Sequence, residues 1–200
     1  NILGFSNITF SRTEYDRDYL NGTEHDEYDS TSNTFLLTNT IIKNNFDITP
    51  GIEYEEFDGS FNNRGQYYSA SVDTGGENIG YFVNGNISLS NSLSLSVGVR
   101  QDDPSLFDDY STKRIGGVFK IGSGLTLKAN YSTAVKTPTL YEMHGSDNYG
   151  YNGNPNLLPE ESETTDLGFE FVIGDAVFDL VYFDTAASAQ KPQVVIDELN

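Results

Sequence analysis

Hydrophobic and polar residues alternate with a period of two along much of the chain. Such a period predicts β-strands, because successive side chains of a strand point to opposite faces of the sheet. Apolar residues at helical spacing are scarce. The apolar stripes consist mainly of Leu, Ile, Val, Phe and Tyr, and they run through segments 81–89, 93–99, 115–121, 125–131, 167–173 and 176–182. The pattern therefore predicts an all-β fold.

Short turns separate neighbouring stripes. These turns are Ser90-Asn91-Ser92, Gly122-Ser123-Gly124 and Gly174-Asp175. Loops of two or three residues suit β-hairpins, and Gly in the first position suits a type II′ turn. The residues that flank each turn then face each other, so both stripes fall on the same face of the sheet. We expect a fourth short turn at Lys43-Asn44-Asn45, where the uniformly apolar segment 35–42 does not fix the register.

Long polar segments alternate with the short turns along the chain. We expect loops at Asp16–Asn33, Asp58–Asn78, Asp102–Tyr110 and Ala134–Glu163. An antiparallel meander puts alternate connections at opposite ends of the sheet, so all the long loops would lie at one end. About nine strands sorted in this way favour an outer-membrane β-barrel, with an apolar outer face and a polar lumen. A Greek-key sandwich gives no reason for such sorting.

The composition is consistent with a sheet that has one apolar face. Hydrophobic residues make up 36% of the chain, below the usual ~45–50%. Aromatic residues make up 13%, whereas disordered acidic chains have few of them. Tyr81, Tyr131 and Tyr182 lie near the loop ends of their strands, as in the aromatic girdles of membrane barrels. Tyr is also a good strand former, so this placement has a second explanation.

Charge and residue usage exclude several classes of function. The net charge of −19 argues against nucleic-acid binding, which needs a basic footprint. The chain has no Cys, so a disulfide scaffold and a Cys nucleophile are excluded. The chain has two histidines, His25 and His144, so we do not expect a metal site built from several histidines. No apolar run is long enough for a transmembrane helix, and the first residues lack the features of a signal peptide.

Several short motifs follow one another in residues 131–171. They are Tyr131-Ser132-Thr133, Lys136-Thr137-Pro138-Thr139-Leu140-Tyr141-Glu142, Gly153-Asn154-Pro155-Asn156-Leu157-Leu158-Pro159-Glu160 and Asp166-Leu167-Gly168. In this order, before an alternating strand, they resemble the barrel domain of TonB-dependent outer-membrane receptors. The vitamin B12 (cobalamin) receptors are the most similar subgroup, and siderophore receptors share most of the pattern. The resemblance covers about residues 80–185.

The resemblance implies a transporter of the bacterial outer membrane and not an enzyme. The family has a 22-stranded barrel around an N-terminal plug, and the TonB complex of the inner membrane drives uptake through that plug. The implied partners are outer-membrane lipid, lipopolysaccharide, the TonB complex and a small-molecule nutrient. The alternation stops after Asp184. We therefore expect residues 1–185 to be an internal piece of the barrel, without the plug, and residues 186–200 to be an atypical tail.

Residues of the longest expected loop are candidates for two roles. Tyr149, Tyr151 and Asn152 combine aromatic and polar groups at a loop apex, and we expect them to contact a ligand. The motif residues Pro138, Gly153, Asn154, Pro155, Pro159 and Glu160 are expected to shape the loop, because Pro fixes φ and ends strand pairing. No nucleophile motif or phosphate-binding loop is present.

An acidic segment is a candidate for Ca²⁺ binding. Ca²⁺ takes six to eight oxygen ligands, and cobalamin receptors of the family can bind it in acidic outer loops. The candidate ligands are Asp16, Asp18, Asp26, Glu27 and Asp29, and their spacing is not that of an EF-hand. The alternative is a solvated acidic loop without a metal.

The most favoured function is therefore part of an outer-membrane receptor that imports a scarce nutrient, cobalamin first and a ferric siderophore second. One alternative is a small, complete outer-membrane barrel or adhesin. Another is a soluble acidic β-sandwich that binds carbohydrate. The sandwich would bury the apolar stripes in a core, whereas a membrane barrel would leave them on its outer surface.

Overall fold

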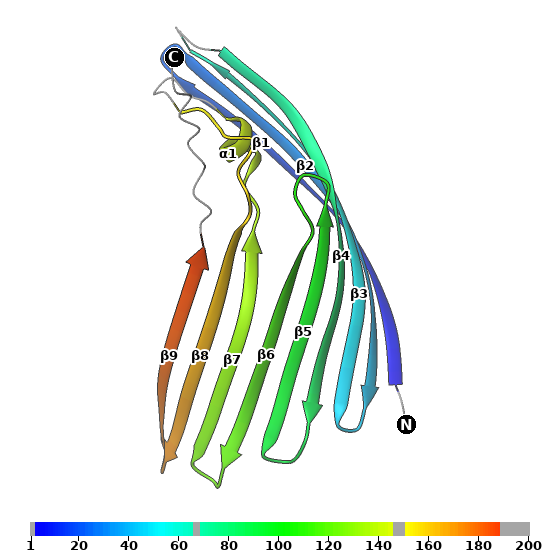
Figure 1. The fold of residues 1–200 in the computed structure, drawn as a ribbon, viewed down its shortest axis with the longest axis vertical. Helices are drawn as coiled ribbons and strands as arrows, with labels where there is room; N and C mark the ends of the chain where they lie inside the picture. Colours follow the sequence, from blue (N-terminus) through cyan, green and yellow to red (C-terminus); the bar gives the residue numbers. More distant parts are fainter. Residues whose placement is uncertain (1–2, 66–68, 146–150, 189–200) are drawn as a thin grey trace, which may run out of the picture.

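The computed structural model describes residues 3–65, 69–145 and 151–188, and its strands form one antiparallel sheet (Figure 1). The spatial order follows the sequence from β1 to β9, as the meander predicts. One short helix, α1 (Leu140–His144), lies between β7 and β8. No helix in the described ranges is long and apolar enough to cross a membrane. The strands are β1 (Leu3–Asn21), β2 (Glu24–Lys43), β3 (Phe46–Arg64), β4 (Ser69–Ser88), β5 (Leu93–Pro104), β6 (Tyr110–Ile121), β7 (Leu125–Lys136), β8 (Glu160–Ile173) and β9 (Ala176–Ser188).

The predicted apolar stripes share one face of the sheet. The register places them directly opposite one another in the pairs Val83↔Val99, Val97↔Ile115, Ile115↔Tyr131, Leu127↔Phe169 and Phe169↔Leu180. Most of these side chains are exposed, for example Val99 at 59% and Leu180 at 64%, and Leu127 and Tyr131 are half-buried. The described strands form a single sheet, and β1 is not paired with β9. The arrangement is that of an open barrel wall and not of a sandwich core.

The predicted turns lie where the pattern places them. Ile121 pairs with Leu125 and Ile173 with Ala176, and the amide of Leu89 donates to the carbonyl of Leu93 across the third turn. The fourth turn is the two-residue Asn44-Asn45, because Lys43 pairs with Phe46. This register also determines which face of the sheet each residue of the apolar segment 35–42 occupies, because alternate residues face opposite sides. All four turns lie at the lower end of the sheet in Figure 1.

Two of the expected long loops are wrong, because their residues continue the strands. β1 and β2 run through Asp16–Asn33 and meet at a tight turn, where Gly22 has a φ of 63°. β3 and β4 likewise run through most of Asp58–Asn78. These segments are polar because they are strands that continue beyond the apolar stripes. The other two connections are loops, and the one between β7 and β8 contains α1.

The outward apolar side chains form a band of limited height. On β3 the outward row runs from Phe46 to Tyr54, which is about 26 Å at ~3.3 Å per residue. The apolar band of outer-membrane barrels is about 25 Å tall. Above the row formed by the pairs Phe10↔Phe35 and Tyr54↔Ile79, β1–β4 continue through residues 11–34 and 55–78. We call this part the extension.

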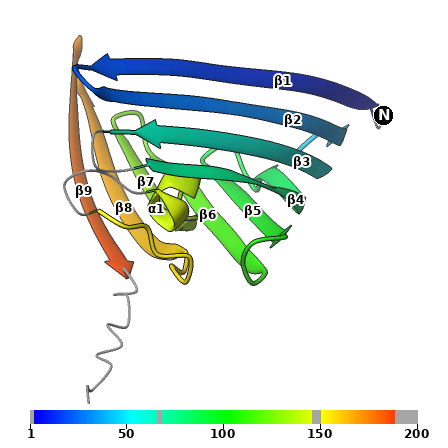
Figure 2. The same cartoon turned by 90° about the horizontal axis from the view of Figure 1, so that it is seen from above.

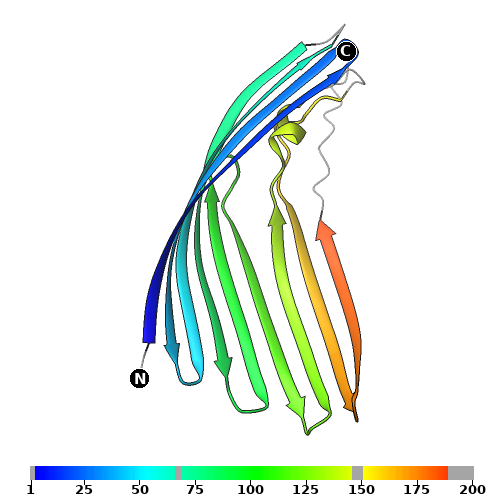
Figure 3. The ribbon, with the colours of Figure 1, turned by 180° about the vertical axis from the view of Figure 1, so that it is seen from behind.

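The sheet is curved, and the short helix lies on its concave side (Figure 2). Seen from behind, the extension bends over above the ends of β5–β9 (Figure 3). Contacts with α1 identify the concave face, because Leu140 lies against Gly59 and Tyr141 lies against Phe61. Every second residue of each strand shares that face, and the apolar band occupies the opposite, convex face. The concave face is therefore the lumenal face of a barrel wall.

Candidate functional site on the concave face

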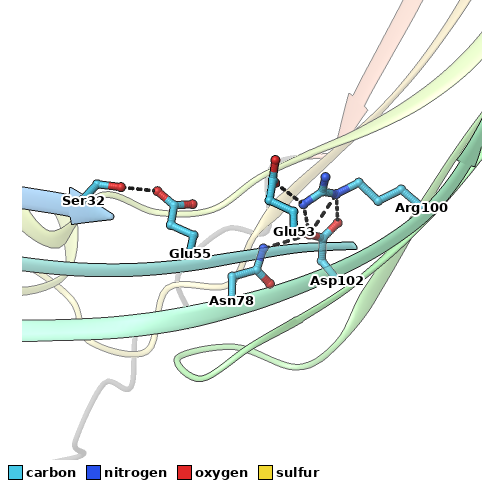
Figure 4. A network of polar contacts seen from close by, with 6 residues as sticks. All are labelled: Ser32, Glu53, Glu55, Asn78, Arg100 and Asp102. Carbon is cyan, nitrogen blue, oxygen red and sulfur yellow. Dashed lines mark hydrogen bonds and ion pairs between the residues drawn. The ribbon is translucent and has the colours of Figure 1, made fainter. Parts of the chain in front are cut away.

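An ion-pair network lies on the concave face where β3, β4 and β5 leave the apolar band (Figure 4). Arg100 Nε donates to Oδ1 and Oδ2 of Asp102 at 3.0 and 2.8 Å. Its Nη2 donates to Asp102 Oδ1 at 2.7 Å and to Glu53 Oε1 at 2.8 Å. The Asp102 side chain is 4% exposed and that of Arg100 is 29% exposed. One guanidinium thus neutralises part of two carboxylates that the fold brings together.

Neighbouring residues hold this network in place. Asn78 Nδ2 donates to Asp102 Oδ1 at 2.8 Å, and the ring of Phe82 lies 5.8 Å from the guanidinium carbon of Arg100. Gly80 leaves room for the guanidinium, because a Cβ there would overlap it. Ser32 donates to Glu55 at 2.7 Å on the same face. Arg100 and Asp102, which make the three hydrogen bonds to each other, therefore come from the same end of one strand.

The helix α1 begins with a complete capping box. The amide of Glu142 donates to Thr139 Oγ1 at 3.2 Å, and the amide of Thr139 donates to Glu142 Oε2 at 2.8 Å. The amide and hydroxyl of Thr139 together hold the pKa of Glu142 below its usual value of 4.5. The Thr-x-x-Glu sequence is a readable start signal for a helix. The expectation of a loop across this segment overlooked that signal and is wrong for the residues of α1.

Aromatic side chains fix α1 to the extension. The ring of Tyr141 lies 5.9 Å from that of Phe61 and 6.4 Å from that of Tyr28. Phe61 and Met143 are 4% and 6% exposed, and they are the buried hydrophobic residues of the described part of the chain. Tyr28 and Phe61 face each other on neighbouring strands. This cluster was not predicted, because no sequence pattern links α1 to a hairpin about 80 residues earlier.

The motif at residues 153–160 closes the loop onto α1. The amide of Gly153 donates to the carbonyl of Gly145 at 2.6 Å, and the amide of Asn154 donates to the carbonyl of Glu142 at 3.0 Å. A Cβ on Gly153 would lie 2.6 Å from the amide nitrogen of His144, so only glycine fits. Pro155 lies in the turn and Pro159 precedes β8. Glu160 begins β8, with its carboxylate 3.9 Å from Lys136 Nζ.

The predicted ligand residues have different surroundings. Tyr151 stacks on Tyr141 with ring centroids 5.2 Å apart and planes 4° apart, and 37% of it is exposed. Its hydroxyl lies 3.4 Å from the carbonyl oxygens of Tyr141 and Glu142. Asn152 is exposed beside it, and Tyr149 lies outside the described residues. Contact of Tyr151 and Asn152 with a ligand stays a prediction.

The five predicted calcium ligands do not converge. Asp16 pairs with Asp29 and Asp18 with Glu27 on the convex face, whereas Asp26 faces the concave side. His25 Nε2 lies 2.7 Å from Asp18 and 3.4 Å from Glu27. Burial, followed by the charge of Glu24, raises the pKa of Asp26. Within the described residues no group of three or more acidic or imidazole side chains is placed to hold a metal ion.

Comparisons with known proteins agree with this architecture. A family model described as "TonB dependent receptor-like, beta-barrel" matches residues 2–188. The vitamin B12 transporter BtuB of Photobacterium profundum is 27% identical over 129 residues, which are 62% of this chain and 20% of that protein. The chain therefore spans about a fifth of the length of this curated relative.

Solved structures of similar shape are more distant in sequence. The siderophore receptor PirA of Pseudomonas aeruginosa has a TM-score of 0.62 and 21% identity, over 92% of this chain and 40% of that one. The copper transporter OprC has a TM-score of 0.70 and 12% identity, over 92% and 35%. The ferric yersiniabactin receptor FyuA of Yersinia pestis has a TM-score of 0.64 and 13% identity, over 93% and 33%. At these identities the likeness shows the fold.

Proposed function

Since this chain belongs to the TonB-dependent receptor-like β-barrel family, we propose that it forms part of the wall of an outer-membrane receptor that imports a scarce nutrient. The family comprises receptors and transporters and not enzymes. The observation that carries the proposal is the exposed apolar band on the convex face, because water would oppose its exposure and lipid would not. No bond is made or broken in this function.

The proposed nutrient is cobalamin, with a ferric siderophore as the second candidate. Similarity to a vitamin B12 transporter, at 27% identity, supports cobalamin. The siderophore candidate is supported by neighbours such as PirA and FyuA, whose likeness extends over more of the chain at lower identity. In the proposed receptor, the mouth of the barrel near Tyr151 and Asn152 contacts the nutrient, and transport depends on the TonB complex acting through a plug.

Equilibrium binding by the full-length receptor tests the choice of nutrient. We expect nanomolar binding of cobalamin, and weaker binding after Tyr151→Ala or Asn152→Ala. Thr23→Ala, in the exposed turn of the extension, is the matched control and should leave binding unchanged. Nanomolar binding of a ferric siderophore without binding of cobalamin would refute the first choice and support the second. Binding of neither would refute the nutrient proposal.

Two further measurements address location and cofactors. Fractionation of cells should place the receptor in the outer membrane, and recovery in the soluble fraction would contradict the proposal. We also propose that Ca²⁺ assists binding by drawing together some of Asp16, Asp18, Asp26, Glu27 and Asp29, which do not converge without the ion. Repeating the binding measurement with a Ca²⁺ chelator tests this, and unchanged affinity would refute a role for calcium.

A further inference from the structure

Asparagine followed by glycine is a reactive pair in a polypeptide, because glycine has no side chain to shield its amide nitrogen. That nitrogen can attack Cγ of the preceding asparagine. The chain has three such pairs, Asn21-Gly22, Asn84-Gly85 and Asn152-Gly153. The attack requires a glycine nitrogen that makes no hydrogen bond, that water can reach, and that belongs to a backbone able to open. The structure distinguishes the three pairs by these requirements.

The fold holds the backbone of two of the pairs. Gly85 lies inside β4, opposite Ile48 of β3 and Val97 of β5. A strand with antiparallel partners on both sides uses its amides in the ladder, so the nitrogen of Gly85 is engaged. The amide of Gly153 donates to the carbonyl of Gly145 at 2.6 Å. An attack by either glycine would first have to break these hydrogen bonds.

The third pair, Asn21-Gly22, lies in the turn at the tip of the extension. Asn21, Gly22 and Thr23 are exposed, and a Cβ built on Gly22 would have no atom within 4 Å. The turn pairs Asn21 with Glu24, and the amide of Gly22 donates to no other backbone group in the described part of the chain. Water can therefore reach both the nucleophilic nitrogen and the side chain that it attacks.

Strand pairing ends at this turn, so the backbone can open there. Asn21 and Glu24 form the last pair between β1 and β2, and the pairing of β2 with β3 begins at His25. This last pair therefore has no third strand beside it, and local opening costs least at such ends. An extended backbone holds Cγ of Asn21 away from the nitrogen of Gly22. Opening of a single pair is thus sufficient to bring the two atoms together.

We propose that Asn21 is a site of spontaneous deamidation in the folded protein. The nitrogen of Gly22 loses its proton to solvent and forms a bond to Cγ of Asn21. The bond from Cγ to Nδ2 breaks, and Nδ2 takes up a proton and leaves as ammonia. Water then opens the succinimide ring: its attack on Cγ gives aspartate, and its attack on the main-chain carbonyl carbon gives an isoaspartyl link, which adds a CH₂ group to the main chain. Each product carries a new carboxylate.

The new carboxylate lies in acidic surroundings. Asn21 is directly opposite Glu24, and like charges directly opposite each other destabilise a pair of strands. Tyr19 and Asp26 form a pair of the same face further along the strands. Burial and then the charge of Glu24 raise the pKa of Asp26. Deamidation therefore loosens the tip of the β1–β2 hairpin and leaves the apolar band unchanged.

Peptide mapping by mass spectrometry of the full-length receptor in lipid vesicles tests the site. In mildly alkaline buffer, Asn21 should convert to aspartate and isoaspartate at least ~10-fold faster than Asn84 and Asn152. The receptor unfolded in denaturant is the control, and there the three pairs should react at similar rates because the hydrogen bonds of Gly85 and Gly153 are lost. Equal rates in the folded receptor would overturn the proposal. The same preference for Asn21 in the unfolded receptor would also overturn it, because the local sequence would then explain the preference.

Hydrogen exchange tests the effect on the hairpin. Asn21→Asp should speed exchange in segment 19–26 about two- to fivefold, and adding Glu24→Gln should remove this effect. Asn91→Asp, which adds the same charge in the turn between β4 and β5, is the matched control and should leave exchange in segment 19–26 unchanged. Unchanged exchange in the Asn21→Asp receptor would refute the loosening of the tip.

The proposal is independent of the proposed function, because it requires neither the nutrient nor the TonB complex. Deamidation at Asn21 in a receptor that binds neither nutrient would support the modification site and refute the function. Nutrient binding by a receptor in which Asn21 reacts no faster than Asn84 and Asn152 would support the function and refute the modification site.

Discussion

Replacing Arg100 with Met should destabilise the barrel wall strongly. The substitution removes a guanidinium that makes three contacts of 2.7–3.0 Å to Asp102 and one of 2.8 Å to Glu53. Asp102, with a side chain 4% exposed, would then be a buried carboxylate without its cation. Breaking a buried pair in this way costs ~3–5 kcal/mol. Because the Arg100 side chain is 29% exposed, we expect about 2–4 kcal/mol.

The assay is reversible denaturant unfolding of the full-length receptor in lipid vesicles. Arg12→Met is the matched control, because Arg12 and Glu14 form an ion pair with side chains 55% and 65% exposed, a type worth about 0–1 kcal/mol. Adding Asp102→Asn to Arg100→Met should restore part of the lost stability, since the uncompensated charge disappears. A loss below about 1 kcal/mol for Arg100→Met, equal to the control, would refute the buried-pair reasoning.

Three other predictions concern the convex face and the loop that contains α1. Phe169→Arg, at the centre of the convex apolar band, should cost ~2–4 kcal/mol in the same assay, whereas Thr126→Arg on the concave face should cost clearly less. Equal costs would contradict the assignment of the two faces. Gly153→Ala should make segment 137–159 more sensitive to protease, because the added Cβ would lie 2.6 Å from backbone atoms. Gly4→Ala is the control, since a Cβ there has its nearest atom at 3.5 Å, and it should leave the protease sensitivity unchanged. The pKa of Glu142 is lower in the folded loop than its usual value of 4.5. The ionised carboxylate therefore stabilises the folded loop at pH values above 4.5, and this stabilisation is lost as the pH falls through the lowered pKa. Protease sensitivity should therefore rise below about pH 4.5, and Glu142→Gln should abolish that dependence; an unchanged pH profile would refute it.

The order of the strands and the face of each apolar stripe were predictable because one local rule determines them. Once Ile121 faces Leu125 across a short turn, the two-residue period places every later residue of both strands. The rule failed for segment 11–34, where polar residues alternate with polar residues and carry no information about a face. The Gly22 turn in this segment is a hairpin signal that its acidic neighbours obscured.

The contacts of the candidate site were less predictable than its backbone. The motif at Gly153 was predicted to shape the loop. Its hydrogen bonds to residues 142–145 hold the backbone of Gly153 so close to α1 that a Cβ would not fit, which is a physical reason for the glycine. The aromatic cluster of Tyr28, Phe61 and Tyr141 could not be found in this way. Its members come from three elements, and their meeting depends on the curvature of the whole sheet. Curvature follows from twist accumulated over many strands, which no short motif encodes.

The position of this cluster explains how strands that continue beyond the apolar band can stay ordered. The extension has a mainly polar convex face, and no second sheet covers its concave face among the described residues, so backbone pairing is its main source of order. A few strands without a packed face are marginally stable in water. Phe61 and Met143 are the two apolar side chains buried in the described part of the chain, and both lie where α1 meets the extension. The loop between β7 and β8 therefore packs against the extension and supports it, and its capping box stabilises the helix that completes the buried cluster found among the described residues.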